Sequence, residues 1–239
     1  MSIARSLLYG LANVLHPRML WLMLWPMLVA LAVWGGAALV LWVRTAQRLA
    51  AWLEGGLDWA LAWAHFDLHA LSLVAANVLL FLGFVPLVYL TALFILSVFG
   101  MQKMVDYVAS RSFPGLERRR GGGFAGSGWN GLVALFGLVG FGLLSLPFWF
   151  FPPLWPVIPV LVLGWVNQRL LRYDALAEHA DRQEMARLFR SHRADLYVLG
   201  VLLALVAYVP IIGFFAPVLF GLAFIHYLLA ALAAERYPR

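Results

Sequence analysis

Three arginines with helical spacing are the residues of this chain best suited to bind an anion. Arg187, Arg190 and Arg193 lie three apart in RYDALAEHADRQEMARLFRSHRAD, so they fall broadly on one face of a helix. The planar guanidinium group matches the geometry of an oxyanion through its paired N–H donors. The alternative is cytoplasmic charge that only contacts lipid phosphates. The spacing therefore indicates either an anion vestibule or a topogenic cluster.

A second candidate site precedes the first apolar segment. His16, Pro17 and Arg18 stand where a helix begins, and a free helix N-terminus offers backbone N–H groups to an oxyanion. A topogenic anchor is an equally good reading of Arg18. The predicted substrate-binding residues are thus Arg18, His16, Arg187, Arg190 and Arg193.

Other motifs give no catalytic, metal or cofactor site. His65 and His69 are four apart, as metal ligands often are, but no third ligand follows with suitable spacing. The stretch GGGFAG, residues 121–126, satisfies G-x-G-x-x-G without the preceding strand that a nucleotide site needs, and we expect a flexible linker there. No nucleophile, Walker or zinc-protease motif is present, so we expect no enzymatic activity and no cofactor.

The composition is that of an integral membrane protein. Of the 239 residues, 64% are hydrophobic and only 12% are charged, too few to cover a surface in water. The net charge of +6 would suggest nucleic acid in a soluble protein, but here it is better explained by cytoplasmic arginines, and we expect no nucleic-acid partner. The chain has no cysteine, which excludes disulfides and thiolate metal sites.

Charge-free segments predict an all-α membrane fold in a single domain, with two long transmembrane helices and two helical hairpins. The long helices are residues 19–43 and 70–108, and a predicted outer interfacial helix, residues 46–69, joins them. The hairpins are residues 130–168 and 196–234, separated by a cytoplasmic helical segment at residues 172–195. In that segment, Asp181 followed by Glu184 is typical of a capping box, and we expect the helix to continue into the second hairpin.

Each hairpin is expected to enter the membrane part-way, because prolines and glycines interrupt it at its middle. The first carries prolines at 147, 152, 153, 156 and 159, and the second reads VPIIGFFAP. Neither interruption contains a charge, which is unusual for a loop in water. Backbone that turns inside a bilayer must be covered by protein, which predicts a homo-oligomer. Two tight full crossings per segment remain the alternative.

Charge counting predicts the orientation. Only Arg44 and Arg48 fall between the first two spans, so fifteen of the 17 Lys and Arg residues face one side. By the positive-inside rule that side is the cytoplasm, which would hold both termini. The four apolar blocks, residues 19–43, 70–101, 130–168 and 196–234, contain no Asp, Glu or Lys. His226 is the residue in them that could titrate, although a bond across a helix interface is its commoner use. Asn77, Asn130, Asn167 and Gln168 are expected to bond between helices.

In the order of its motifs the chain resembles the CysZ-type sulfate permease family, bacterial relatives of the etoposide-induced membrane proteins. The resemblance covers about residues 5–237 and is strongest in RYDALAEHADRQEMARLFRSHRADLYVLG and VPIIGFFAPVLFGLAF, with support from HPRMLWLMLWP and FGMQKMVDYVA. It implies two spanning helices with two partly inserted hairpins, an oligomer in the bacterial inner membrane, and sulfate uptake for cysteine biosynthesis without ATP hydrolysis.

Two positions depart from the family pattern. Family members that resemble sulfate permeases carry adjacent arginines near the first span, where this chain has Leu20 and Trp21, and A-P-F-N where it has Ser97 to Gly100. The arginine face favours a permease for sulfate or a related oxyanion. The missing pair favours an oligomeric scaffold or lipid-organising protein that transports nothing.

Overall fold

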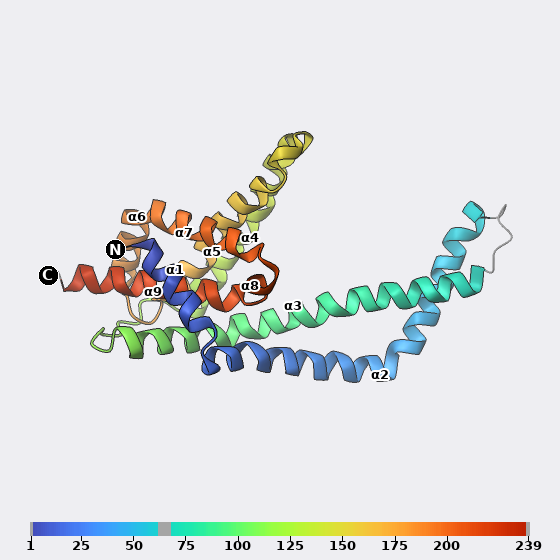
Figure 1. Cartoon of the computed structure of the whole chain (residues 1–239), viewed down its shortest axis with the longest axis horizontal. Coiled ribbons are helices and arrows are strands. Elements are labelled where there is room, and N and C mark those ends of the chain that lie inside the picture. Colours follow the sequence, from blue (N-terminus) through green and yellow to red (C-terminus); the bar gives the residue numbers. More distant parts are fainter. Residues whose placement is uncertain (1, 62–67, 238–239) are drawn as a thin grey trace. The chain divides into compact units, whose positions relative to one another are not determined.

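The structure, a computed structural model, describes residues 2–61 and 68–237, and its regular elements there are all helices (Figure 1). Five of these helical segments are long and apolar enough to cross a membrane: Pro17–Gly56, His69–Ser97, Ala125–Phe150, Pro152–Leu176 and Ala216–Arg236. The predicted all-α, multi-pass membrane class is therefore confirmed. The chain divides into two compact units, residues 22–98 and residues 1–21 with 99–239.

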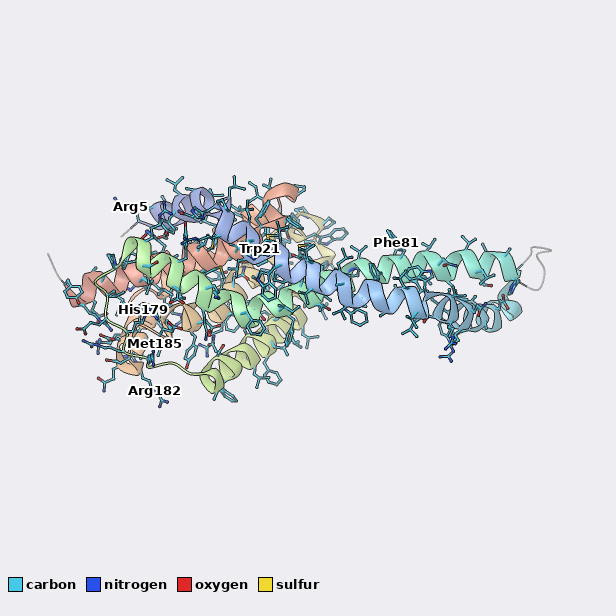
Figure 2. All side chains as sticks on the ribbon, turned by 90° about the horizontal axis from the view of Figure 1, so that it is seen from below. Arg5, Trp21, Phe81, His179, Arg182 and Met185 are labelled. Atoms are coloured by element: carbon cyan, nitrogen blue, oxygen red, sulfur yellow. The ribbon has the colours of Figure 1, made fainter. Side chains whose placement is uncertain are left out.

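In the first unit, the long helices α2 (Pro17–Leu61) and α3 (Leu68–Ser112) run antiparallel and are joined by side-chain hydrogen bonds. Trp34 Nε1 donates to Thr91 Oγ1 at 2.9 Å, and Trp42 Nε1 donates to Asn77 Oδ1 at 2.9 Å. The expected interhelical role of Asn77 is thus confirmed. Most apolar side chains of this unit project outward, as Phe81 does (Figure 2), which suits contact with lipid chains.

The region predicted as a separate interfacial helix begins inside α2. Figure 1 shows a bend in α2, and residues 46–61 continue the same helix. Glu54 accepts hydrogen bonds from Ser72 and contacts the Nδ1 atom of His69, each at 2.7 Å. His65 and its neighbours at 62–67 lie outside the described residues. The position of residues 46–69 at the outer surface stays a prediction.

The second unit is built around α9 (Ala216–Arg236), whose side chains are almost all buried. Helix α1 (Ile3–Val14) crosses α9 at Gly10, where an added Cβ atom would lie 3.0 Å from Leu219 Cδ1. The end of α3 packs on the same core through Met104 and Tyr107. His226 of α9 contacts Ser6 of α1 at 3.1 Å, which confirms its expected interhelical role.

Residues 124–176 form two antiparallel helices that meet at the prolines. Helix α4 (Phe124–Ser145) is followed by the short 3-10 turns η1 (Leu146–Phe150) and η2 (Pro152–Leu154) and by α5 (Val157–Leu176). Phe141 packs edge-on against Trp165 at 5.0 Å, and Asn130 Nδ2 donates to the carbonyl of Arg169. Asn130 therefore bonds between helices as expected, whereas Gln168 bonds to Arg172 within α5.

The remaining helices are α6 (Arg182–Ser191), α7 (Arg193–Ala207) and α8 (Pro210–Phe214), which lead into α9. The predicted capping box is confirmed: Asp181 Oδ1 accepts from the backbone of Glu184, and Glu184 Oε2 accepts from the backbone of Asp181. The expected continuation of this helix is wrong. It stops at Ser191, and His192, with φ −108° and ψ 21°, separates it from α7.

The glycine stretch expected to be a flexible linker is held by backbone hydrogen bonds at its start. The N–H of Gly121 donates to the Ala180 carbonyl and that of Gly122 to the Ala177 carbonyl, both at 2.9 Å. A Cβ atom on either glycine would lie 2.5 Å from atoms of the 177–181 segment. Glycine is required here because two backbones touch, so the flexible-linker prediction is wrong for residues 121 and 122.

Candidate functional site: a basic groove

Two cavities flank α6 and the start of α7, and they divide the predicted arginine face between them. The first, about 740 Å³, is lined by Arg187, Arg190 and Glu235 among others. The second, about 660 Å³, lies between α5, α6 and α7 and is lined by Arg190, Arg193, Gln168, Trp165 and Tyr197 with several apolar side chains. We call this second cavity the basic groove.

Arg187 differs from its two neighbours in having a carboxylate partner. Its Nε donates to Glu235 Oε1 at 2.8 Å, and this bond raises the pKa of Arg187. A guanidinium group that is already hydrogen-bonded to a carboxylate has fewer free N–H donors and less unneutralised charge with which to bind an incoming anion. Arg187 therefore contributes to the first cavity as half of an ion pair.

Arg190 and Arg193 are exposed, and no carboxylate of the described residues lies within 4 Å of either guanidinium. Ser191 and the buried Gln168 add a hydroxyl and an amide to the same groove. The two guanidinium groups carry a fixed positive charge and can donate hydrogen bonds, as can the Gln168 amide, whereas the Ser191 hydroxyl already donates to the Arg187 carbonyl at 3.0 Å. The groove can accept a partly desolvated anion.

Two further arginines support this charge from α5, and the sequence reasoning did not select them. The Nε atoms of Arg169 and Arg172 are buried and donate to no atom of the described chain. Arg172 lies over the Phe189 ring at 4.8 Å, donates to Gln168 Oε1 at 3.3 Å, and is acted on by the charges of Arg169 and Arg193. Arg190 and Arg193, which line the groove, are thus backed by Arg172 and Arg169. None of these four arginines has a carboxylate partner among the described residues, and we call them the unpaired cluster.

Elsewhere in this unit, three arginines have carboxylate partners. Arg118 donates to Asp106 at 2.6 Å, and both Arg119 and Arg236 donate to the buried Glu184, at 2.9 and 2.7 Å. These bonds, led by that from Arg236, lower the pKa of Glu184 to about 2. Other described arginines of this unit, Arg5 and Arg18 among them, also lack a carboxylate within 4 Å. The distinguishing feature of the basic groove is therefore that several such arginines are grouped there.

A close crossing of α5 and α7 brings Arg169 and Arg172 near Arg193. At the contact of α5 and α7, a Cβ atom on Gly164 would lie 2.5 Å from Val201 Cγ2, and Gly200 faces the Gly164 carbonyl. Small residues let two helix backbones approach closely. Arg169 and Arg193 are 24 positions apart in sequence, and the glycines are the signal that could have placed them on neighbouring helices.

The other predicted pair, His16 and Arg18, does not line either cavity. His16 Nδ1 accepts from the backbone N–H of Arg18 at 3.3 Å, so the imidazole caps the start of α2, and its ring packs against Tyr107 at 5.3 Å. Arg18 is exposed. Of the two positions where the family pattern has arginines, Trp21 is 62% exposed and apolar. Among residues 16–21, Arg18 is therefore the cation that the start of α2 offers to an anion.

The described residues contain no group of three His, Asp or Glu side chains that could hold a metal ion. His69 instead contacts Glu54.

Comparison with protein families matches residues 6–217 to the family described as Sulfate transporter CysZ/Etoposide-induced protein 2.4. The chain belongs to this family. The match spans the basic groove, α1 and the whole of α2 to α7, and it ends one residue after α9 begins. No characterised protein and no solved structure matches the chain.

Proposed function

We propose that this CysZ family member is an ATP-independent permease for sulfate or a related oxyanion, in the bacterial inner membrane with both termini in the cytoplasm. The unpaired arginine cluster of the basic groove carries the proposal. Membership of the family supports the substrate class. Sulfate taken up in this way would feed sulfur assimilation into cysteine.

In this proposal, Arg190 and Arg193 make the first contacts with the anion. Their exposed guanidinium groups replace water around two of its oxygens, and Gln168 and Ser191 supply further polar contacts. Arg172 and Arg169 lie behind them and add positive potential. Arg18, Arg187 and His16 would only attract the anion from a greater distance or anchor the chain at the membrane surface.

The path through the membrane is proposed to involve several subunits. Helix α7 has 15 residues, about 22 Å in length, which is short for a hydrocarbon core of about 30 Å. The 3-10 turns between α4 and α5 expose Phe148, Phe150 and Phe151 without any nearby charge. Partly inserted hairpins of this kind need covering protein, which favours a homo-oligomer.

The test is uptake of radiolabelled sulfate into proteoliposomes. The double variant Arg190→Gln, Arg193→Gln should lower uptake at least about tenfold, because each lost charge-assisted hydrogen bond is worth about 1.5–3 kcal/mol. Arg182→Gln is the matched control, since Arg182 lies on α6 as Arg190 does, is exposed and lines neither cavity. Arg18→Ala reports on the other predicted site.

Uptake by the wild type at the level of empty liposomes would contradict the permease. It would favour the second candidate, a lipid-organising scaffold that transports nothing. The observation in favour of that role is the apolar wall of the basic groove, made by Phe141, Leu161 and Val162, which could hold an acyl chain beside the arginines.

A further inference from the structure

A third cavity, distinct from the basic groove, lies between the start of α1, the end of α3 and the C-terminal half of α9. Its volume is about 770 Å³. Three serines, Arg5 and His226 form its polar lining, and Phe113, Tyr237 and three alanines form the rest: Ala230, Ala233 and Ala234. We call it the Arg5 cavity. Arg5 projects from α1 in Figure 2.

The polar lining donates hydrogen bonds and contains no carboxylate. Arg5 is exposed, and no carboxylate of the described residues lies within 4 Å of it. Ser2 caps α1, so the positive end of that helix dipole also faces this region. Ser6 and Ser112 add hydroxyl groups. The combination of one cation and a helix N-terminus suits an oxyanion, while the Ser6 and Ser112 hydroxyls are engaged by His226 and Tyr9.

His226 is held in place at the cavity by three other side chains. Its Nδ1 is 3.1 Å from Ser6 Oγ, its ring stacks on Tyr9 with centroids 4.2 Å apart, and the Phe113 ring lies 5.7 Å away. Ser112 in turn donates to the Tyr9 hydroxyl at 3.3 Å. Because Nδ1 is engaged by Ser6, Nε2 is the ring nitrogen left to contact a ligand. A positioned imidazole beside Arg5 is a pre-organised binding group.

The size and the apolar wall of the cavity indicate which kind of molecule the oxyanion group belongs to. The cavity volume of about 770 Å³ is in the range of pockets for organic ligands, roughly 300–1,000 Å³. It is far larger than the volume of a five-atom inorganic ion. The alanine face of α9 and Phe113 offer contact to hydrocarbon. We propose that the Arg5 cavity binds the phosphate group of an anionic phospholipid, with Arg5 and His226 Nε2 as its ligands. The site is independent of the basic groove and of transport.

Isothermal titration calorimetry of the purified full chain in neutral detergent tests this proposal. Short-chain phosphatidylglycerol is the probe, and inorganic phosphate is titrated in parallel. Arg5→Gln should weaken lipid binding by about tenfold or more through loss of a charge-assisted hydrogen bond. Arg182→Gln, a charge-matched exposed control, should bind as the wild type does. His226→Asn is a second variant that tests the imidazole separately.

The outcomes distinguish a lipid phosphate from free phosphate as the ligand. They also test this proposal independently of the proposed transport function. Binding of inorganic phosphate but not of phosphatidylglycerol, weakened by Arg5→Gln, would overturn the phospholipid as the ligand and leave a site for a free oxyanion. Absence of binding by the wild type, or equal binding by the wild type and Arg5→Gln, would overturn it. The Arg190→Gln, Arg193→Gln variant should keep this binding whether or not sulfate uptake fails, so neither result decides the other.

Discussion

At the scale of single residues, Glu184 is a carboxylate that joins segments of its unit far apart in the sequence. It is 3% exposed and accepts from Arg119, from Arg236 and from the backbone of Asp181. Arg236 is itself buried and also donates to the carbonyls of Glu117 and His179. One side chain thereby fixes the end of α9, the 113–123 loop and the start of α6.

Replacing Glu184 with Gln should lower the free energy of unfolding by about 3 kcal/mol, because two arginines lose a buried carboxylate partner. The measurement is thermal denaturation in detergent, and the expected result is a clear fall in Tm. Glu117→Gln is the control, since the Glu117 side chain is 69% exposed and lies 3.8 Å from Arg119. Equal Tm values for both variants would contradict this role of Glu184.

The same contacts predict a pH dependence. Because the folded pKa of Glu184, about 2, lies below the ordinary value of 4.5, the folded state binds fewer protons than the unfolded state between these pH values. The contribution, about 3 kcal/mol, is therefore fully present above pH 4.5 and is lost as the pH falls towards 2. The Tm difference between wild type and Glu184→Gln should shrink over that window. A constant difference would show that the bonds do not depend on the charge.

Residues of this kind show what local sequence can predict. The capping role of Glu184 follows from its spacing to Asp181, three positions away. Its partners Arg236 and Arg119 are 52 and 65 positions away and could not be chosen from many arginines without the fold. The same limit hid Arg169 and Arg172 behind Arg190 and Arg193.

At the scale of elements, glycines decide where segments touch. The apolar pattern predicts helices well, because long charge-free runs have few alternatives in a membrane. It does not predict which helix faces meet. Gly164 and Gly200 mark the crossing of α5 and α7, and Gly121 and Gly122 mark the contact of the 113–123 loop with the end of α5.

The loop contact can be tested with a pair of adjacent glycines. In Gly122→Ala the new methyl group would lie 2.5 Å from Ala177 Cβ, so the loop must move and the free energy of unfolding should fall by about 1–3 kcal/mol. At Gly123 an added Cβ meets no atom within 4 Å, so Gly123→Ala is the matched control. Limited proteolysis of the 113–123 loop and Tm are the measurements. Equal protection of both variants from proteolysis would indicate that this stretch is the flexible linker that the sequence predicts.

At the scale of the whole molecule, charge distribution and helix length bear on the membrane arrangement. The excess of arginine outside the two long spans predicts that both hairpins start and end in the cytoplasm, whether they cross fully or enter part-way. The two hairpins differ in the length of their helices. Helix α4 has 22 residues, about 33 Å, and α5 has 20, about 30 Å, whereas α7 has only 15. The helices of the first hairpin are long enough to cross the membrane. The part-inserted arrangement therefore needs testing most at this hairpin.

Cysteine labelling measures this directly, because the native chain has no cysteine. Phe150 and Tyr208 are exposed positions at the turns of the two hairpins, 87% and 55% exposed, and suit substitution better than Gly213, whose added Cβ would contact the Ala207 carbonyl. In the part-inserted arrangement, an impermeant maleimide added from the periplasm should label neither Phe150→Cys nor Tyr208→Cys. Gly56→Cys, near the predicted outer end of α2 with open space around it, is the positive control.

Labelling of Phe150→Cys as fast as Gly56→Cys would mean that α4 and α5 cross completely, as their lengths permit. The proline turns would then lie in water, where backbone groups freed by proline are satisfied by solvent and need no second subunit. Protection of both turns in intact cells, with labelling after the membrane is dissolved in detergent, would instead leave turned backbone within the bilayer. That backbone must be covered, so the same result would make a homo-oligomer a physical requirement of the fold.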